Sequence, residues 1–108
     1  MRRTENDFRV GLEELLATAN SASEHAKERP RSELPERERR ALGAKNAIQQ
    51  LQTKELRAIT TLRKEIREIA GDKRMDGDRK RRLMDIREAK IRRISEEGLR
   101  KLDRIWNR

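Results

Sequence analysis

The sequence contains no cysteine and no tyrosine, and Phe8 and Trp106 are its two aromatic residues. Without cysteine the chain can form no disulfide, no thiolate nucleophile and no cysteine-based zinc site. Hydrophobic residues make up 32% and charged residues 45% of the 108 residues, which leaves too little apolar surface for a large globular core. This composition argues against an enzyme and predicts a small, basic, non-catalytic interaction protein.

Long apolar runs are also missing. No stretch approaches the ~20 apolar residues that span a bilayer. The basic start Met1-Arg2-Arg3 is not followed by the apolar segment of a signal peptide. We therefore expect no membrane partner, no secretion through a signal peptide, and a cytoplasmic location.

Helix is the one regular structure that the residue pattern favours. Glu, Arg, Lys, Leu, Ala and Gln dominate, and no stretch alternates apolar and polar residues as a strand does. The expected fold is all-α: an N-terminal amphipathic helix in 1–28, a linker in 29–35 that contains Pro30 and Pro35, and a helical hairpin in 36–108.

The hairpin is expected to be long, antiparallel and coiled-coil-like, with helices over 36–70 and 78–107 and a polar turn at 71–78. Gly71 is expected to end the first helix in a left-handed conformation, and Asp78 to cap the second. Residues at one level of an antiparallel pair have a constant sum of residue numbers. Seven apolar pairs have sums of 148 to 150: Ile66–Leu83, Leu62–Ile86, Ile59–Ile91, Leu56–Ile94, Leu51–Leu99, Ile48–Leu102 and Ala44–Ile105.

The seam of the hairpin is not a clean heptad, because Ile48 to Ile59 is a step of eleven residues, which straightens a coiled coil. Gly98 lowers the helix propensity of the last segment. It is expected either to open room opposite Leu51 and Gln52 or to mark a soft point.

The N-terminal helix carries its own apolar seam. Phe8, Leu12, Leu15, Ala19, Ala22 and Ala26 follow steps of three and four residues. Two helices alone make a marginal seam, so the hairpin needs cover from this helix, from a second copy or from a larger assembly. We predict a separate docking arm, with Phe8, Leu12 and Leu15 binding a protein partner; covering the hairpin is the alternative. Trp106 is a further candidate partner anchor, or a cap of the seam.

No residue set supports catalysis, a cofactor or a metal ion. His25 is the single histidine, and a solvent-exposed or partner-facing side chain is expected there. The turn resembles a calcium loop only in part, since Arg74 and Leu83 occupy positions where oxygen ligands are needed.

Positive charge is concentrated toward the C-terminus. Residues 1–35 have a net charge of −1, 36–70 of +4 and 71–108 of +6. Eight residues of the last helix are candidates for binding nucleic acid: Arg79, Lys80, Arg81, Arg82, Arg92, Arg93, Arg100 and Arg104. Aromatic residues are absent among them, which argues against base stacking. The alternative is a solvated face, with i,i+4 pairs such as Glu96–Arg100 and Glu88–Arg92.

The run Leu62-Arg63-Lys64-Glu65-Ile66-Arg67-Glu68-Ile69, the polar turn, and the run Lys80-Arg81-Arg82-Leu83-Met84-Asp85-Ile86-Arg87 resemble helical hairpins in bacteriophage-encoded virion proteins. The resemblance covers about residues 56–95 and is mostly one of composition and turn placement. It implies a structural part in a phage particle, as an internal, ejection or connector-associated protein, and hence a virion location.

Two functions therefore compete. The first is a structural interaction protein, a small component of a larger assembly that docks through apolar helix faces. The second is a small nucleic-acid-binding or regulatory protein that uses the Arg-rich last helix. They differ in their response to salt, because phosphate contacts are strongly screened and apolar seams are not. An inhibitor of a larger enzyme is a third function that the sequence does not separate from the first.

Overall fold

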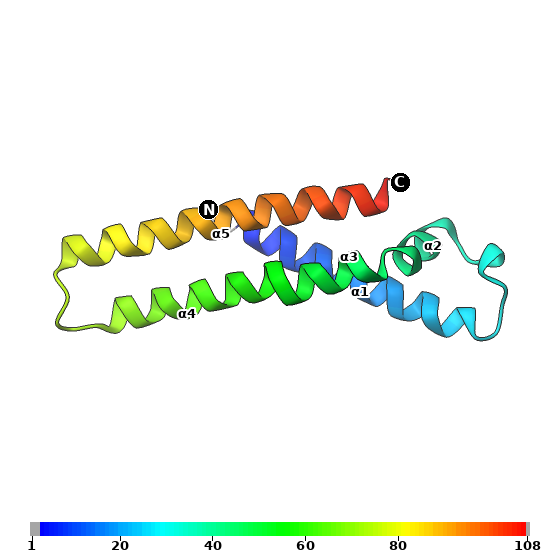
Figure 1. The fold of residues 1–108 in the computed structure, drawn as a ribbon, viewed down its shortest axis with the longest axis horizontal. Coiled ribbons are helices and arrows are strands. Elements are labelled where there is room, and N and C mark those ends of the chain that lie inside the picture. Colours follow the sequence, from blue (N-terminus) through cyan, green and yellow to red (C-terminus); the bar gives the residue numbers. More distant parts are fainter. Residues whose placement is uncertain (1–2, 108) are drawn as a thin grey trace.

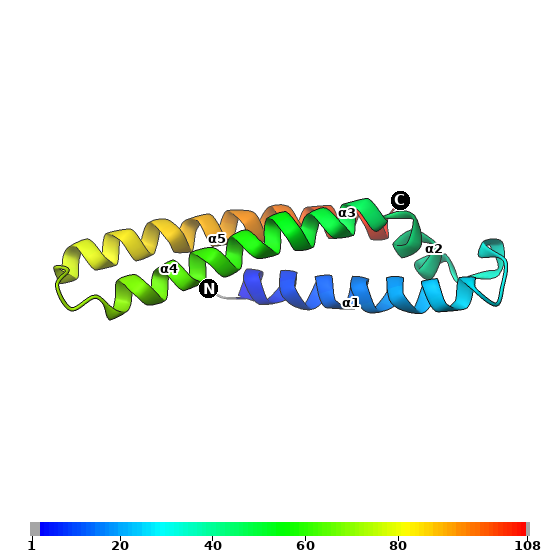
Figure 2. The ribbon, with the colours of Figure 1, turned by 60° about the horizontal axis from the view of Figure 1, so that its bottom comes forward.

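A computed structural model describes residues 3–107, which form an all-α rod with principal extents of 61 × 22 × 18 Å (Figure 1). In chain order its elements are α1 (Arg3–Ala26), the 3-10 turn η1 (Arg31–Glu33), α2 (Glu36–Gly43), α3 (Lys45–Gln50), the π-helical segment η2 (Leu51–Leu56), α4 (Arg57–Gly71) and α5 (Gly77–Trp106). α3, η2 and α4 follow one another without a break and form one arm of the hairpin, and α5 forms the other (Figures 1 and 2).

The predicted hairpin is confirmed, but its turn is built differently from the prediction. None of the described residues has a positive φ, so Gly71 does not end α4 in a left-handed conformation. The chain instead leaves the helix at Asp72 in an extended conformation, and the Asp72 carboxylate accepts a hydrogen bond from the Arg74 N–H at 2.9 Å. Asp76, rather than Asp78, precedes the first residue of α5, and its side chain makes no capping hydrogen bond.

The predicted single helix over 36–70 is wrong at Ala44. This residue has φ −102° and ψ 20°, and it separates α2 from α3. The preceding Gly43 has low helix propensity, which weakens the helix at this point. The change in direction brings α2 over α1, where Ala22 and Ala41 are both fully buried. Their small side chains allow the two helices to approach closely.

The irregular seam coincides with the π-helical segment Leu51–Leu56. After Leu51 the next apolar residue is Leu56, a step of five, and Glu55 takes the intervening core-facing position. A π-type turn, with i→i+5 hydrogen bonding, brings a step of this length back onto one face. Glu55 is 7% exposed, and its carboxylate accepts a hydrogen bond from Lys101 Nζ at 2.5 Å. Lys101 of α5 therefore balances the negative charge of Glu55, which the π-helical segment places in the core.

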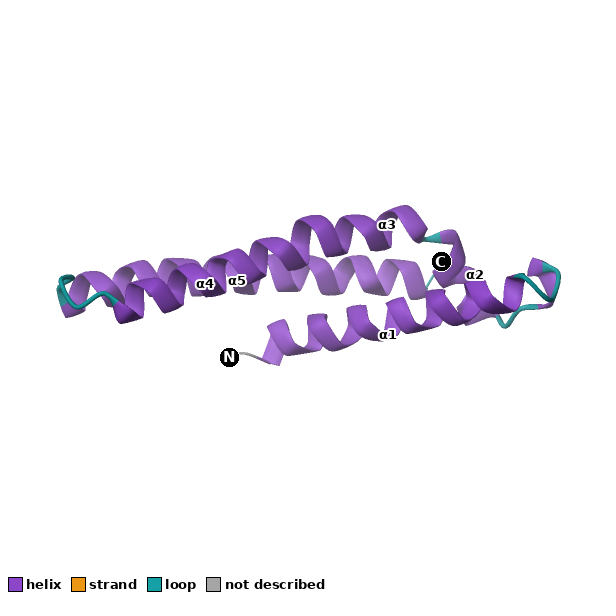
Figure 3. Cartoon of the chain, turned by 90° about the horizontal axis from the view of Figure 1, so that it is seen from below, coloured by secondary structure: helices purple, strands orange, loops and turns teal. Residues whose placement is uncertain are grey.

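α1 lies along the hairpin and supplies a third layer at the end opposite the turn (Figures 2 and 3). One buried apolar cluster joins the layers: Phe8, Leu12, Leu15, Ala41, Ala44, Ile48, Leu51, Ile59, Ile66, Ile91, Leu102 and Ile105. Gly98 makes room for the Phe8 ring of α1 rather than opposite Leu51 and Gln52, which was one of the two roles expected for it. A Cβ at Gly98 would lie 2.6 Å from Cδ1 and 2.8 Å from Cζ of Phe8, and closer still to Cε1.

The hydroxyl of Ser95 is buried in this core without a partner. Ser95 is 0% exposed, and among the described residues its Oγ has no hydrogen-bond partner. We expect Ser95→Ala to raise the free energy of unfolding by about 1 kcal/mol, because it removes an unsatisfied polar group and raises helix propensity. Urea unfolding followed by circular dichroism measures the change. Ser21→Ala, at an exposed site of α1, is the control; an equal gain there would contradict the role of burial.

Candidate functional site

The predicted partner-binding residues of α1 are not on an open surface. Phe8, Leu12 and Leu15 are at most 1% exposed and pack into the chain's own core. The structure therefore does not show α1 as a separate docking arm. Instead α1 covers the hairpin, which was the alternative prediction. The physical reason is that the hairpin seam needs a third layer, and Gly98 lets the Phe8 ring enter it.

Trp106 closes the open end of the bundle. It is partly buried against the core cluster, and its backbone carbonyl accepts a hydrogen bond from the Arg40 guanidinium of α2. The Arg37 guanidinium lies 4.1 Å from the centroid of the indole ring, a cation–π contact. These contacts attach α2 to the end of α5, so Trp106 caps the seam.

The side of α5 that faces away from the core forms a basic surface, which we call the α5 outer face. Its residues follow steps of three and four and are all exposed: Arg79, Arg82, Ile86, Lys90, Arg93, Glu97, Arg100 and Arg104. This spacing places them on one side of a helix. With a rise of 1.5 Å per residue, the face is about 38 Å long. It carries six cations and one carboxylate.

In the part of the chain that the structure describes, the cations of the α5 outer face are not paired with carboxylates, whereas some of the other basic residues are. Arg9, Arg37, Arg40, Arg63, Arg87 and Lys101 each lie within 4.0 Å of a carboxylate. Within residues 3–107, no carboxylate comes that close to any cation of the α5 outer face. The predicted pairs Glu96–Arg100 and Glu88–Arg92 are not formed, and Glu88 contacts Arg63 instead. The outer-face charges are thus free to meet an external anion.

No protein-family model, curated protein or solved structure matches this chain.

The structure divides the eight predicted nucleic-acid-binding residues. Arg79, Arg82, Arg93, Arg100 and Arg104 belong to the α5 outer face. The other three lie off it: Arg81 and Arg92 are exposed on a flank, and Lys80 is partly buried and donates a hydrogen bond to the carbonyl of Ala70. The prediction missed Lys90 and Ile86, although the steps of three and four that run through both are visible in the sequence. Ile86 was predicted to face Leu62 in the seam, and at 52% exposure it does not.

The described part of the chain contains neither a cluster of metal ligands nor a membrane-spanning helix. Among residues 3–107 no cluster of three His, Asp or Glu side chains is arranged to hold a metal ion. In the same range, no helix has the length and apolarity to cross a membrane. His25 is exposed, as expected, and its Nδ1 lies 2.9 Å from the Glu38 carboxylate, which links the end of α1 to α2.

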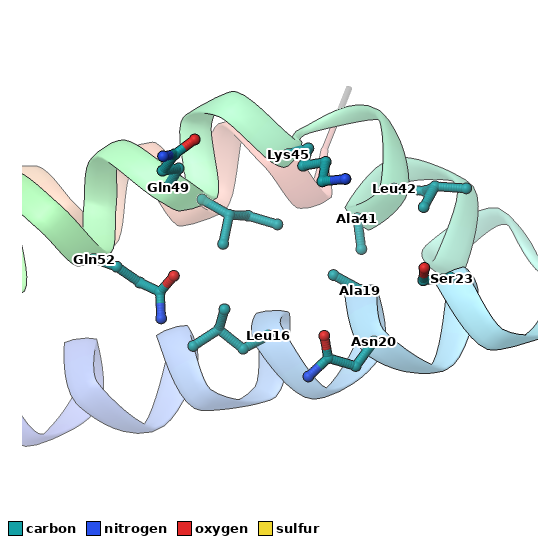
Figure 4. Close-up of a pocket in the computed structure, with 10 residues that line it drawn as sticks. Leu16, Ala19, Asn20, Ser23, Ala41, Leu42, Lys45, Gln49 and Gln52 are labelled. Atoms are coloured by element: carbon teal, nitrogen blue, oxygen red, sulfur yellow. The ribbon is translucent and has the colours of Figure 1, made fainter.

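A groove lies between α1 and the start of the hairpin (Figure 4). It has a volume of about 360 Å³, and side chains of α1, α2, α3 and η2 line it: Leu16, Ala19, Asn20, Ser23, Ala41, Leu42, Lys45, Ile48, Gln49 and Gln52. Leu16 and Ala19 point into it from α1, while Asn20 and Gln52 lie at its edge (Figure 4). Lys45 is the one ionisable group in this lining, so the groove can enclose an apolar group but holds no acid–base pair.

The N-terminal half of α1 is tied to the hairpin by a charge cluster. Arg63 of α4 donates hydrogen bonds to Glu5 of α1 at 3.0 Å and to Glu88 of α5 at 2.5 Å. The hydrogen bonds and charge of Arg63, helped by Arg9, hold the pKa of Glu5 below its usual value, while burial acts in the opposite direction. The same contacts raise the pKa of Arg63. This cluster binds all three layers together at one level.

We expect the Glu5 cluster to make stability depend on acid pH. Because the pKa of folded Glu5 is depressed, its contribution is complete above the ordinary carboxylate value and is lost as the pH falls through the folded value. Glu5→Gln should cost about 1.5–3 kcal/mol at pH 7, the range for hydrogen bonds to charged groups, and should flatten the loss between pH 7 and pH 3. Urea unfolding at both pH values measures this. Glu13→Gln, on the exposed side of α1, is the control. An identical pH dependence in Glu5→Gln and the unmodified protein would contradict the prediction.

Proposed function

We propose that this chain is a non-enzymatic binding protein that attaches to a nucleic acid through the α5 outer face. The observation that carries the proposal is the arrangement of charge: six exposed cations lie on one side of α5 with one carboxylate among them, and in the described residues none of the six lies within 4.0 Å of a carboxylate. Unpaired, exposed guanidinium groups in a line are suited to a chain of phosphates, and each contact releases condensed counterions.

The same face favours a duplex over a single strand. It is about 38 Å long and carries no aromatic residue on which an unpaired base would stack. Six cations can neutralise up to six phosphates. The proposed binding is therefore electrostatic and independent of sequence.

We expect the affinity for a 20-base-pair duplex to fall steeply with salt. The slope of log K against log salt should be about −5, which is roughly a thousand-fold loss between 50 and 200 mM salt. Fluorescence anisotropy with a labelled duplex measures it. Arg93→Glu with Arg100→Glu should weaken binding at least ten-fold at 50 mM salt. Arg29→Glu with Arg39→Glu, which makes the same change in net charge at exposed sites outside α5, should have little effect. Equal losses in both variants, or no binding at 50 mM salt, would overturn the proposal.

A structural role in a larger assembly, such as the phage particle that the resemblance implies, is the second candidate function. It is supported by the shape of the molecule, a 61 Å rod in which the hairpin extends well beyond α1 (Figure 1). An extended arm of this kind offers surface to a protein neighbour without disturbing the core.

A further inference from the structure

The hairpin has a distal arm, residues 67–90, that α1 does not reach (Figure 2). The structure describes all of these residues, and none of them is buried. Ile69, Met75, Leu83 and Met84 remain partly exposed, whereas Ile59 and Ile91, beneath α1, are at most 1% exposed. The three-layered bundle thus becomes a two-layered one, and its apolar seam continues without cover.

The third layer ends at the Glu5–Arg63–Glu88 cluster. A cavity of about 430 Å³ opens there, between Glu5, Asn6 and Arg9 of α1 and Arg63, Ile66 and Arg67 of α4. From this level the surface that α1 covers continues into the arm, because steps of four and three residues keep to one side of a helix.

We call this continuation the α1-side face of the arm. On α4 the steps lead from Arg63 to Arg67 and Ala70, and on α5 they lead from Glu88 to Met84 and Arg81. With Ile66, the face has an apolar floor of Ile66, Ala70 and Met84 between two arginines, Arg67 and Arg81. In the described part of the chain, neither arginine lies within 4.0 Å of a carboxylate.

The chemistry of this face selects the kind of partner. A narrow apolar floor that continues an existing helix–helix interface suits the apolar side of another helix. The flanking arginines favour carboxylates on that helix. A second copy of the arm fits less well, because residues 67–90 carry nine basic and six acidic residues and two arms would repel each other.

We propose that the α1-side face of the arm binds an acidic amphipathic helix of a partner protein, placed end to end with α1. The site is distinct from the α5 outer face and does not depend on nucleic-acid binding. In the bound state the partner helix would restore the third layer and bury Met84 as α1 buries Ile91.

Methyl NMR of the methionines tests the proposal on the full chain. The probe is an 18-residue helical peptide with leucines in steps of three and four and glutamates beside them; a second peptide has lysine in place of every glutamate. We expect the glutamate peptide to shift the methyl signal of Met84 in a saturable manner, and the lysine peptide to bind at least ten-fold more weakly. No saturable shift with the glutamate peptide, or equal binding of the lysine peptide, would overturn the proposal.

Substitutions on opposite sides of the same arm provide a matched pair. Met84→Glu on the α1-side face should weaken binding of the glutamate peptide at least ten-fold in isothermal titration calorimetry, and Ile86→Glu on the outer face should change it less than three-fold. Arg67→Glu with Arg81→Glu gives the same test without altering an apolar residue. Equal losses in Met84→Glu and Ile86→Glu would overturn the proposal.

Sedimentation experiments test whether a second copy occupies the face instead. If the unmodified protein dimerised and Met84→Glu abolished the dimer, the proposal would be overturned and the face would be assigned to a second copy. Duplex binding by Met84→Glu is expected to be unchanged, so failure of this proposal is separable from failure of the nucleic-acid proposal.

Discussion

Gly98→Ala is expected to destabilise the protein by about 2 kcal/mol, although alanine is the better helix former. Helix propensity alone would stabilise the variant by about 1 kcal/mol. The added methyl group, however, would lie 2.6 Å from Cδ1 of Phe8, whose ring is fully buried and cannot swing into solvent. Overpacking of a filled core typically costs 1–3 kcal/mol, and the close contact with an enclosed ring places this site at the upper end of that range.

Urea unfolding and hydrogen exchange measure the effect of Gly98→Ala. The exchange rates of α1 amides should rise more than those of α4, because α1 is the layer that the methyl group displaces. Gly77→Ala is the matched control: it lies in the first turn of the same helix, and a Cβ there meets no atom within 4 Å. A Gly98→Ala variant as stable as Gly77→Ala would show that the Phe8 ring does not rest on Gly98.

The hairpin was predictable because its determinants are local. A polar turn with two glycines separates two segments of 3.6-residue periodicity, and short helix connections favour antiparallel neighbours. The break at Ala44 was not predictable in the same way. Its nearest local signal is Gly43, and the gain from the break is the packing of Ala41 against α1, a contact between segments that are distant in sequence.

The basic surface could be predicted only in part, because neighbours in sequence are not neighbours on a helix. The run Arg79–Arg82 is continuous in the sequence, but successive residues point about 100° apart, so Arg79 and Arg82 share a face that Lys80 and Arg81 leave. Lys90 stands alone between an alanine and an isoleucine and yet lies on the outer face. The same geometry explains why Ile86 was misassigned: its residue number fitted the seam, but its direction did not.

Phe8 was predicted to dock a partner but is buried in the chain's own core, so its removal should cause a large loss of stability. Phe8→Ala should lower the free energy of unfolding by about 3–5 kcal/mol, the usual cost of deleting a buried aromatic ring, and domains of this kind have only 5–15 kcal/mol in total. Val10→Ala, on the exposed side of the same helix, should change it by less than about 0.5 kcal/mol.

The stability changes caused by Gly98→Ala and Phe8→Ala are coupled. We expect Gly98→Ala to destabilise the unmodified protein but to stabilise the Phe8→Ala variant. In the Phe8→Ala background the ring that Gly98 accommodates is gone, so adding Gly98→Ala should no longer destabilise the protein and should recover about 1 kcal/mol through helix propensity and partial filling of the cavity. A double-mutant cycle by urea unfolding measures the interaction. If Gly98→Ala destabilised both backgrounds equally, the cause would lie elsewhere on α5, and α1 would not be held to the hairpin by the contact between this ring and this glycine.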